Sequence, residues 1–177
     1  MIPPQGFEMP GSGRVMLVGE SNPYGDDPDM TLYPFPDGCS GHRLWRVLGV
    51  GRTRYLSFAR ENLCRGIFRM PDARERASIL RDHVKEATYP PEGVRPFSLV
   101  ILCGTRVRQA FGFHDLATWD HVDDVGTHVT WLALPHPNGR SRIWGAGMWG
   151  IGGSVARVRE TLRMVCPHVP WGEEGSP

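Results

Sequence analysis

Carboxylate, amide and imidazole side chains recur in three short stretches of the sequence, each of which follows an apolar run. The stretches are residues 19–25 (GESNPYG), 62–65 (NLCR) and 135–140 (PHPNGR). Side chains of these types can orient a water molecule and stabilise negative charge on a leaving group. If the apolar runs are parallel strands of one sheet, the stretches lie outside the carboxyl ends of those strands, where ligands bind in such sheets. We therefore expect the three stretches to converge on one pocket.

The elements that would position these stretches alternate between strands and helices. The apolar runs predict strands over residues 14–19, 55–63, 97–104 and 129–134. Helices are predicted over residues 41–48, 73–87, 105–111 and 154–165, and the proline-rich and glycine-rich residues 20–40 are predicted to form a long functional loop. Near-continuous apolar strands separated by helices predict an α/β fold of three layers, α/β/α, with a central four-stranded parallel sheet.

The 177 residues suit one domain, which we place at residues 14–166. Residues 1–13 and 167–177 are rich in proline and glycine, so both are expected to be loose tails. No apolar run approaches the roughly 20 residues of a spanning helix, and the N-terminal residues lack the pattern of a signal peptide. The sequence therefore predicts a cytoplasmic monomer with no membrane partner.

Cysteine spacing and charge narrow the functional class further. Cys39, Cys64, Cys103 and Cys166 are widely separated and form no C-x-x-C pair, so a zinc site is disfavoured and reduced thiols are expected. The net charge is +1, which gives no global attraction to nucleic acid. Lys85 is the only lysine; arginine, which supplies all other basic residues, suits phosphate contacts but is also abundant in the products of GC-rich genes.

Taken in order, these motifs resemble the uracil-DNA glycosylase superfamily. Residues 19–24 (GESNPY) resemble its first motif, residues 33–36 (YPFP) and 41–45 (GHRLW) resemble the loop and helix start of its mismatch-specific branch, and residues 136–139 (HPNG) resemble its second motif. Residues 99–104 (LVILCG) match the pattern of its third strand. The resemblance covers about residues 14 to 165 and implies the uracil-DNA glycosylase-like form of the fold. The second motif departs from the family in carrying Asn138 where a serine is usual.

The resemblance implies catalytic roles for three residues. His136 would face a carbonyl of the base and, as a neutral donor, stabilise negative charge there. Asn22 would hold the attacking water if the first motif aligns on Asn-Pro-Tyr, as in the mismatch-specific and classical branches. Glu20 would take that part if the motif aligns on Gly-Glu, as in the iron–sulfur branch. Structural roles are the alternatives: Asn22 capping a turn, His136 satisfied by backbone, and Glu20 as a solvated loop charge.

The resemblance also implies substrate contacts. Phe35 would stack on the flipped base, Tyr24 would exclude the methyl group of thymine, and the amide of Asn62 would read the edge of the base. Asn138, which lies in the second motif, is also expected to contact the substrate. The alternatives are a core aromatic for Phe35, a half-buried loop aromatic for Tyr24 and a strand-end turn residue for Asn62. The loop after the second motif would contact DNA through Arg140, Ser141 and Arg142.

The sequence thus predicts a DNA glycosylase that hydrolyses the N-glycosidic bond of uracil or a related modified base, with water as the nucleophile. The expected partner is single-stranded or double-stranded DNA, and the reaction needs no metal and no organic cofactor. Two alternatives stay open: a non-catalytic or repurposed member of the fold that binds nucleic acid or nucleotides, and a hydrolase of free nucleotides or nucleosides. Arginines around the pocket mouth would favour the DNA enzyme over the hydrolase.

Overall fold

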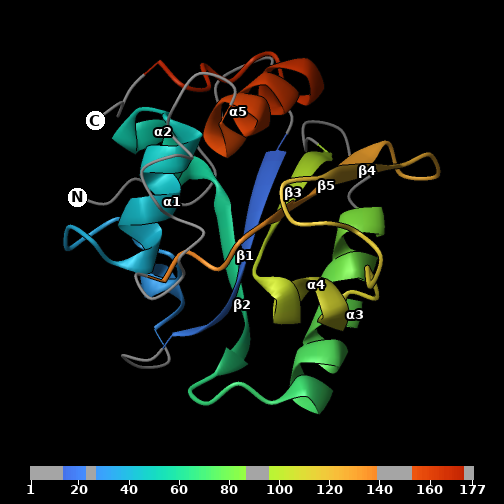
Figure 1. Cartoon of the computed structure of the whole chain (residues 1–177). Coiled ribbons are helices and arrows are strands. Elements are labelled where there is room, and N and C mark those ends of the chain that lie inside the picture. Colours follow the sequence, from blue (N-terminus) through green and yellow to red (C-terminus); the bar gives the residue numbers. More distant parts are fainter. Residues whose placement is uncertain (1–13, 23–26, 87–95, 139–152, 174–177) are drawn as a thin grey trace.

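The protein folds as an α/β domain in the computed structural model, which describes residues 14–22, 27–86, 96–138 and 153–173. Strands and helices alternate along the described residues (Figure 1). The strands are β1 (Arg14–Asn22), β2 (Ala59–Arg65), β3 (Phe97–Cys103), β4 (His121–Asp124) and β5 (Val129–Leu134). The helices are the short 3-10 helix η1 (Pro28–Met30), α1 (Ser40–Leu48), α2 (Arg52–Ser57), α3 (Met70–Glu86), α4 (Thr105–Ala110) and α5 (Ser154–Val165).

The strands form one mixed sheet in the order β2-β1-β3-β5-β4. The first four in this order run parallel, and β4 pairs antiparallel with the end strand β5. The prediction of four parallel strands was therefore wrong in the size of the sheet, because β4 (HVDD) has no apolar run to reveal it. The pairing of β4 with β5 forms an edge of the sheet, where Oγ1 of Thr130 donates a 2.6 Å hydrogen bond to Asp123.

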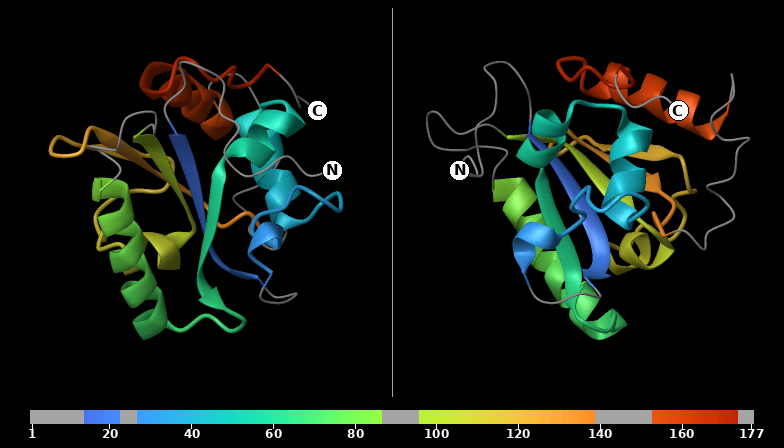
Figure 2. Two further views of the ribbon diagram at one scale, coloured as in Figure 1. Left: turned by 180° about the vertical axis from the view of Figure 1, so that it is seen from behind. Right: turned by 90° about the vertical axis from the view of Figure 1, so that its left-hand side faces the viewer.

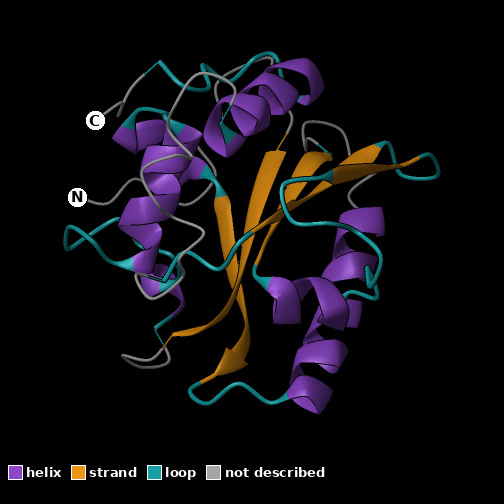
Figure 3. Ribbon diagram, viewed as in Figure 1, coloured by secondary structure: helices purple, strands orange, loops and turns teal. Residues whose placement is uncertain are grey.

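Helices cover both faces of the sheet, as Figures 2 and 3 show. Alternate residues of β1 explain why both faces are buried: Val15 and Leu17 pack with α1, α2 and α5, whereas Met16 and Val18 pack with α3 and α4. All four side chains are at most 2% exposed. The side chains of this central parallel strand therefore contribute alternately to the hydrophobic layers on the two faces of the sheet.

The segment before β2 differs from the prediction of a strand over residues 55–63. Residues 52–57 form α2 instead, and the strand begins at Ala59 and ends at Arg65. The helix buries Tyr55 completely, with its hydroxyl 2.8 Å from the carbonyl of Leu32 and 3.2 Å from that of Gly41. Short apolar runs fit a strand or one face of a helix equally well, and here tertiary contacts favour the helix.

The C-terminal segment packs on the core, so the expectation of a loose tail from residue 167 is wrong for residues 167–173. Val169 is 3% and Trp171 is 1% exposed. The indole N–H of Trp171 donates to the carbonyl of Cys166 at 2.9 Å, and the backbone N–H of Gly172 donates to Leu48 at 3.1 Å. The expected tails at residues 1–13 and 174–177 lie outside the described residues.

The four cysteines are free thiols, as predicted, and three of them are buried. None of the helices in the described part of the chain combines the length and the hydropathy that crossing a membrane would require.

Candidate functional site

A cavity of about 410 Å³ opens at the carboxyl edge of the sheet, on the side of α1. It is formed by the end of β1, by β2, by the segment between η1 and α1, and by the turn that follows β5. The lining residues are Gly19, Glu20, Ser21, Asn22, Met30, Leu32, Tyr33, Phe35, Pro36, Cys39, Ser40, Gly41, Asn62, His136 and Pro137. Its volume falls within the range of about 300–1,000 Å³ that small-molecule sites occupy.

The convergence expected from the sequence is thus observed for the described parts of the three stretches. Glu20, Asn22, Phe35, Asn62 and His136 all line the same cavity. β1 and β2 are parallel neighbours, β5 lies on the other side of β3, and all four strands end at this edge. Their roles in a reaction stay predictions.

Asn62 is placed by the pairing of β1 with β2. Gly19 and Asn62 are register partners, and a Cβ atom at Gly19 would lie 2.6 Å from Oδ1 of Asn62. Only a glycine leaves space for the amide at this point. The side chain of Asn62 therefore lies over the backbone of β1, where its donor and acceptor can face a ligand in the cavity.

His136 is oriented by its own turn. Its Nδ1 accepts a 3.2 Å hydrogen bond from the backbone N–H of Asn138. In the neutral ring the proton therefore sits on Nε2. Nε2 lies 4.0 Å from Oε2 of Glu20, and the side chains of His136 and Glu20 are 30% and 17% exposed.

The electrostatic surroundings of His136 favour the neutral ring. Burial is the largest effect and lowers the pKa of His136 below its ordinary value of 6.5. The Glu20 carboxylate acts in the opposite direction and raises this pKa, whereas the Arg106 guanidinium lowers it. Because burial prevails, His136 is a neutral Nε2–H donor at pH 7.

Gly104, at the end of β3, makes space for this pair. A Cβ atom at Gly104 would lie 3.1 Å from Oε1 of Glu20 and 3.3 Å from both Cβ and Cδ2 of His136. The residue also has a φ of +115°, which side chains disfavour. Glu20 and His136 therefore pack directly against the backbone that links β3 to α4.

The opposite wall of the cavity is the segment that leads into α1. Gly41 lets α1 approach this segment closely, because a Cβ atom there would lie 2.3 Å from the carbonyl oxygen of Leu32. The buried hydroxyl of Tyr55 lies within hydrogen-bond distance of the carbonyl oxygens of both Leu32 and Gly41, and so links this segment to α1. Burial and neighbouring thiols raise the pKa of Tyr55 well above its ordinary value, so this hydroxyl stays a donor. Cys39 caps α1, with its Sγ 3.3 Å from the N–H of His42.

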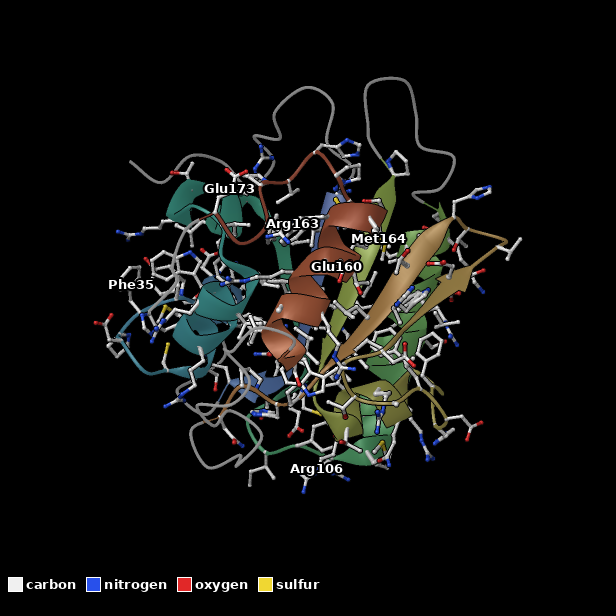
Figure 4. The ribbon with its side chains drawn as sticks, turned by 45° about the horizontal axis from the view of Figure 1, so that its top comes forward. Phe35, Arg106, Glu160, Arg163, Met164 and Glu173 are labelled. Atoms are coloured by element: carbon white, nitrogen blue, oxygen red, sulfur yellow. The ribbon has the colours of Figure 1, made fainter. Side chains whose placement is uncertain are left out.

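Phe35 projects from this wall beside α1 (Figure 4). The guanidinium of Arg52 lies 4.3 Å from the centre of its ring, and the indole of Trp45 lies 6.0 Å away. Phe35 is half-buried and lies in the segment between η1 and α1, which forms this wall of the cavity. Its aromatic ring is therefore fixed at the cavity rather than hidden in the core.

The remaining predicted residues fall elsewhere. Asn138 is exposed and is not among the residues that line the cavity, and its backbone N–H donates to Nδ1 of His136; its expected substrate contact stays a prediction. Tyr24, Arg140, Ser141 and Arg142 lie outside the described residues.

Several site residues were missed by the sequence reasoning. Arg106 lies two residues beyond Gly104, with Nη1 3.8 Å from Oε2 of Glu20. The rule that ligands bind at the carboxyl ends of strands could have drawn attention to it, since it follows β3 directly. The apolar wall residues Met30 and Leu32 had no individual signal, although they lie within residues 20–40, which were predicted to form a functional loop.

Chemically, the cavity combines an apolar wall with a carboxylate, two amides and an imidazole N–H. Such a site can hold a planar polar ring, donate to an oxygen of that ring and order a water molecule beside it. Within the described ranges, no group of three or more His, Cys, Asp or Glu side chains is arranged to hold a metal ion. No known family model matches the sequence, and no curated protein matches it.

Proposed function

We propose that the protein is a DNA glycosylase that hydrolyses the N-glycosidic bond of uracil or a related modified base. The observation that carries this proposal is the convergence of Glu20, Asn22, Phe35, Asn62 and His136 on one cavity of about 410 Å³. The four parallel strands β2, β1, β3 and β5 support it in part, because the resemblance implies a four-stranded parallel sheet, whereas this sheet is mixed and has a fifth strand, β4, at one edge.

The reaction breaks the bond between C1′ of the sugar and the ring nitrogen of the base. The bonding electrons leave with the base, and the oxygen of a water molecule adds to C1′. One proton of that water is released and the departing base is protonated, so the products are a free base and an abasic sugar. The protein must stabilise the cationic sugar, the anionic base and the flipped-out nucleotide.

His136 is suited to the leaving base. Its Nε2 carries the proton because Nδ1 accepts from Asn138, and the neutral ring predominates at pH 7. A donor held in place before the reaction stabilises charge that develops on a base carbonyl, an effect of about 2.7–4 kcal/mol for a single such donor.

Glu20 and Asn22 are suited to the sugar and the water. The carboxylate of Glu20 can stabilise positive charge on the sugar and accept a hydrogen bond from water. The amide of Asn22 lines the same cavity and can hold water without acting as a strong base, which a cationic sugar does not require. Phe35 offers a stacking surface and Asn62 an edge-reading amide for the base.

Arginines near the cavity favour DNA over a free nucleotide as the substrate. Arg43 lies 3.5 Å from the carbonyl of Pro137, Arg52 covers Phe35, and Arg106 reaches Glu20. These three residues come from α1, α2 and α4, and each contacts a residue that lines the cavity. A nucleic-acid backbone carries phosphates on both sides of a flipped nucleotide, which such an arrangement can contact.

The test is base release from labelled oligonucleotides that carry one uracil, hydroxymethyluracil, hypoxanthine or thymine, opposite G, opposite A and unpaired. We expect alkali-sensitive cleavage at one of these bases, a loss of about 100-fold or more in His136→Ala, and an unchanged rate in His121→Ala, which alters a histidine of the distant strand β4. Absence of cleavage by the folded protein at every base would contradict the proposal.

The same assay separates Glu20 from Asn22. Glu20→Gln and Asn22→Ala are compared at saturating substrate, where binding no longer limits the rate. The residue that orients the water should show the larger fall in the single-turnover rate. Wild-type rates for both variants would contradict the site assignment.

A further inference from the structure

Arg106 occupies the first turn of α4, at the lower edge of the molecule in Figure 4. Its side chain is 61% exposed, yet it is held at two points. Nη1 lies 3.8 Å from Oε2 of Glu20, and the guanidinium carbon lies 5.3 Å from the centre of the Phe68 ring. An aromatic ring beneath a guanidinium restricts its position and adds a cation–π attraction.

The same oxygen of Glu20 faces both basic groups. Oε2 is 3.8 Å from Arg106 and 4.0 Å from Nε2 of His136, while Oε1 lies over Gly104. The carboxylate is therefore bounded by Arg106 on one side, His136 on another and the backbone at Gly104 below. Among the ion pairs of the described residues, only that of Arg106 joins an arginine to Glu20.

We propose that Arg106 is a positioning residue that shares Oε2 of Glu20 with His136 and so limits the attraction of that carboxylate for the ring. The inference rests on the proposed function in assigning this pair to catalysis, but it concerns the geometry of the pair itself. Arg106 does not line the cavity, so it acts through Glu20 rather than on the base.

The arrangement gives Arg106 an effect that a structural arginine would lack. The charged groups that face His136 are Glu20 from β1 and Arg106 from α4, and their effects on its pKa are opposite. Arg43, from α1, approaches the turn at the carbonyl of Pro137. Removing the charge of Arg106 leaves the attraction of Glu20 for the protonated ring uncompensated, so the pKa of His136 should rise.

The experiment is an NMR titration of the His136 imidazole protons in the full chain, with His136→Ala used to assign the signal. Arg106→Met keeps a long apolar side chain over Phe68 but removes the charge, and Arg106→Lys restores the charge. Arg74→Gln is the matched control, because it removes one exposed arginine from α3. We expect the pKa of His136 to rise by about 0.5 unit in Arg106→Met, as for one charge lost near a partly solvated group, and to stay near the wild-type value in Arg106→Lys and Arg74→Gln.

Base release provides the second measurement. The acidic limb of the rate profile should move to higher pH in Arg106→Met and return in Arg106→Lys. An unchanged pKa of His136 in Arg106→Met, or an equal rise in Arg74→Gln, would overturn the inference. If the wild type releases no base, the proposed function fails, but the titration still decides whether Arg106 acts on the pair.

Discussion

Gly19 and Asn62 face each other across parallel strands so closely that a Cβ atom at Gly19 would lie 2.6 Å from Oδ1 of Asn62. Gly19→Ala should therefore displace the amide that we assign to the base edge. We expect kcat/KM for base release to fall roughly 10-fold to 100-fold, which is the loss of one or two hydrogen bonds of about 1.4 kcal/mol each. Discrimination between bases should weaken at the same time.

Gly126→Ala is the control for this variant. A Cβ atom at Gly126 would lie 3.4 Å from Oδ1 of Asp124, at ordinary contact distance, in the exposed turn between β4 and β5. Kinetics equal to wild type in both variants would show that Asn62 does not read the base.

The pH dependence of the reaction should follow His136. Because burial lowers its pKa below 6.5, the neutral donor is retained at pH 7 and is lost only as the pH falls through the lowered pKa of the folded state. The rate of base release should therefore be steady from pH 8 to about 6.5 and decline below it. A decline that begins well above pH 7 would contradict the neutral-donor role.

The free energy of unfolding should also depend on pH through His136. Below pH 6.5 the unfolded state binds a proton at this histidine before the folded state does, so the free energy of unfolding falls as the pH falls and levels out below the folded-state pKa. The contribution is measured as the difference between wild type and His136→Asn in urea unfolding at several pH values. An equal pH dependence in the two proteins would exclude it.

Tyr55→Phe should destabilise the wall of the cavity. The variant keeps the ring but removes the hydroxyl that serves the carbonyls of Leu32 and Gly41. Leaving these carbonyls without their donor should cost about 1–3 kcal/mol of the free energy of unfolding, measured by urea denaturation. An unchanged free energy of unfolding would mean that water or another donor replaces the hydroxyl.

Trp171→Ala should be among the most destabilising single changes in the C-terminal segment. Trp171 is 1% exposed, packs 5.7 Å from Phe58 and donates to Cys166. Truncating a buried tryptophan should cost about 3–5 kcal/mol of the free energy of unfolding. Met164→Ala, on the outer face of α5 (Figure 4), is the control, since Met164 is 67% exposed and should change stability by less than about 0.5 kcal/mol. A loss below about 1 kcal/mol in Trp171→Ala would mean that this segment contributes little.

The central strands and the meeting of the three polar stretches could be predicted from the sequence because both follow from strong local signals. β3 is an apolar run over its whole length, and parallel strands must end at the same edge of a sheet. Glu20, Asn22, Asn62 and His136 are placed by that rule alone. Phe35 required the resemblance, because no periodic pattern marks its segment.

The parts that could not be predicted depend on contacts between distant segments. β4 is short and polar, and its place is set by pairing with β5. Trp171 lies within a proline-rich and glycine-rich stretch typical of a tail, yet the apolar surface of α1, α2 and α5 supplies a site for its ring. Arg106 has no motif, and its importance comes from Glu20, Gly104 and Phe68 meeting it in space.

The two outer strands of the sheet have a consequence for the behaviour of the chain at high concentration. Unpaired edges of sheets invite strand addition by other molecules, and proteins discourage it with charges and covering segments. β4 presents Asp123 and Asp124, while Arg60 of β2 binds the carbonyls of Asp29 and Thr31 and so draws the η1 segment along the other edge. Both lateral boundaries of the sheet therefore carry features that discourage intermolecular β-pairing, and neutralising the aspartates of β4 should increase aggregation of the folded protein.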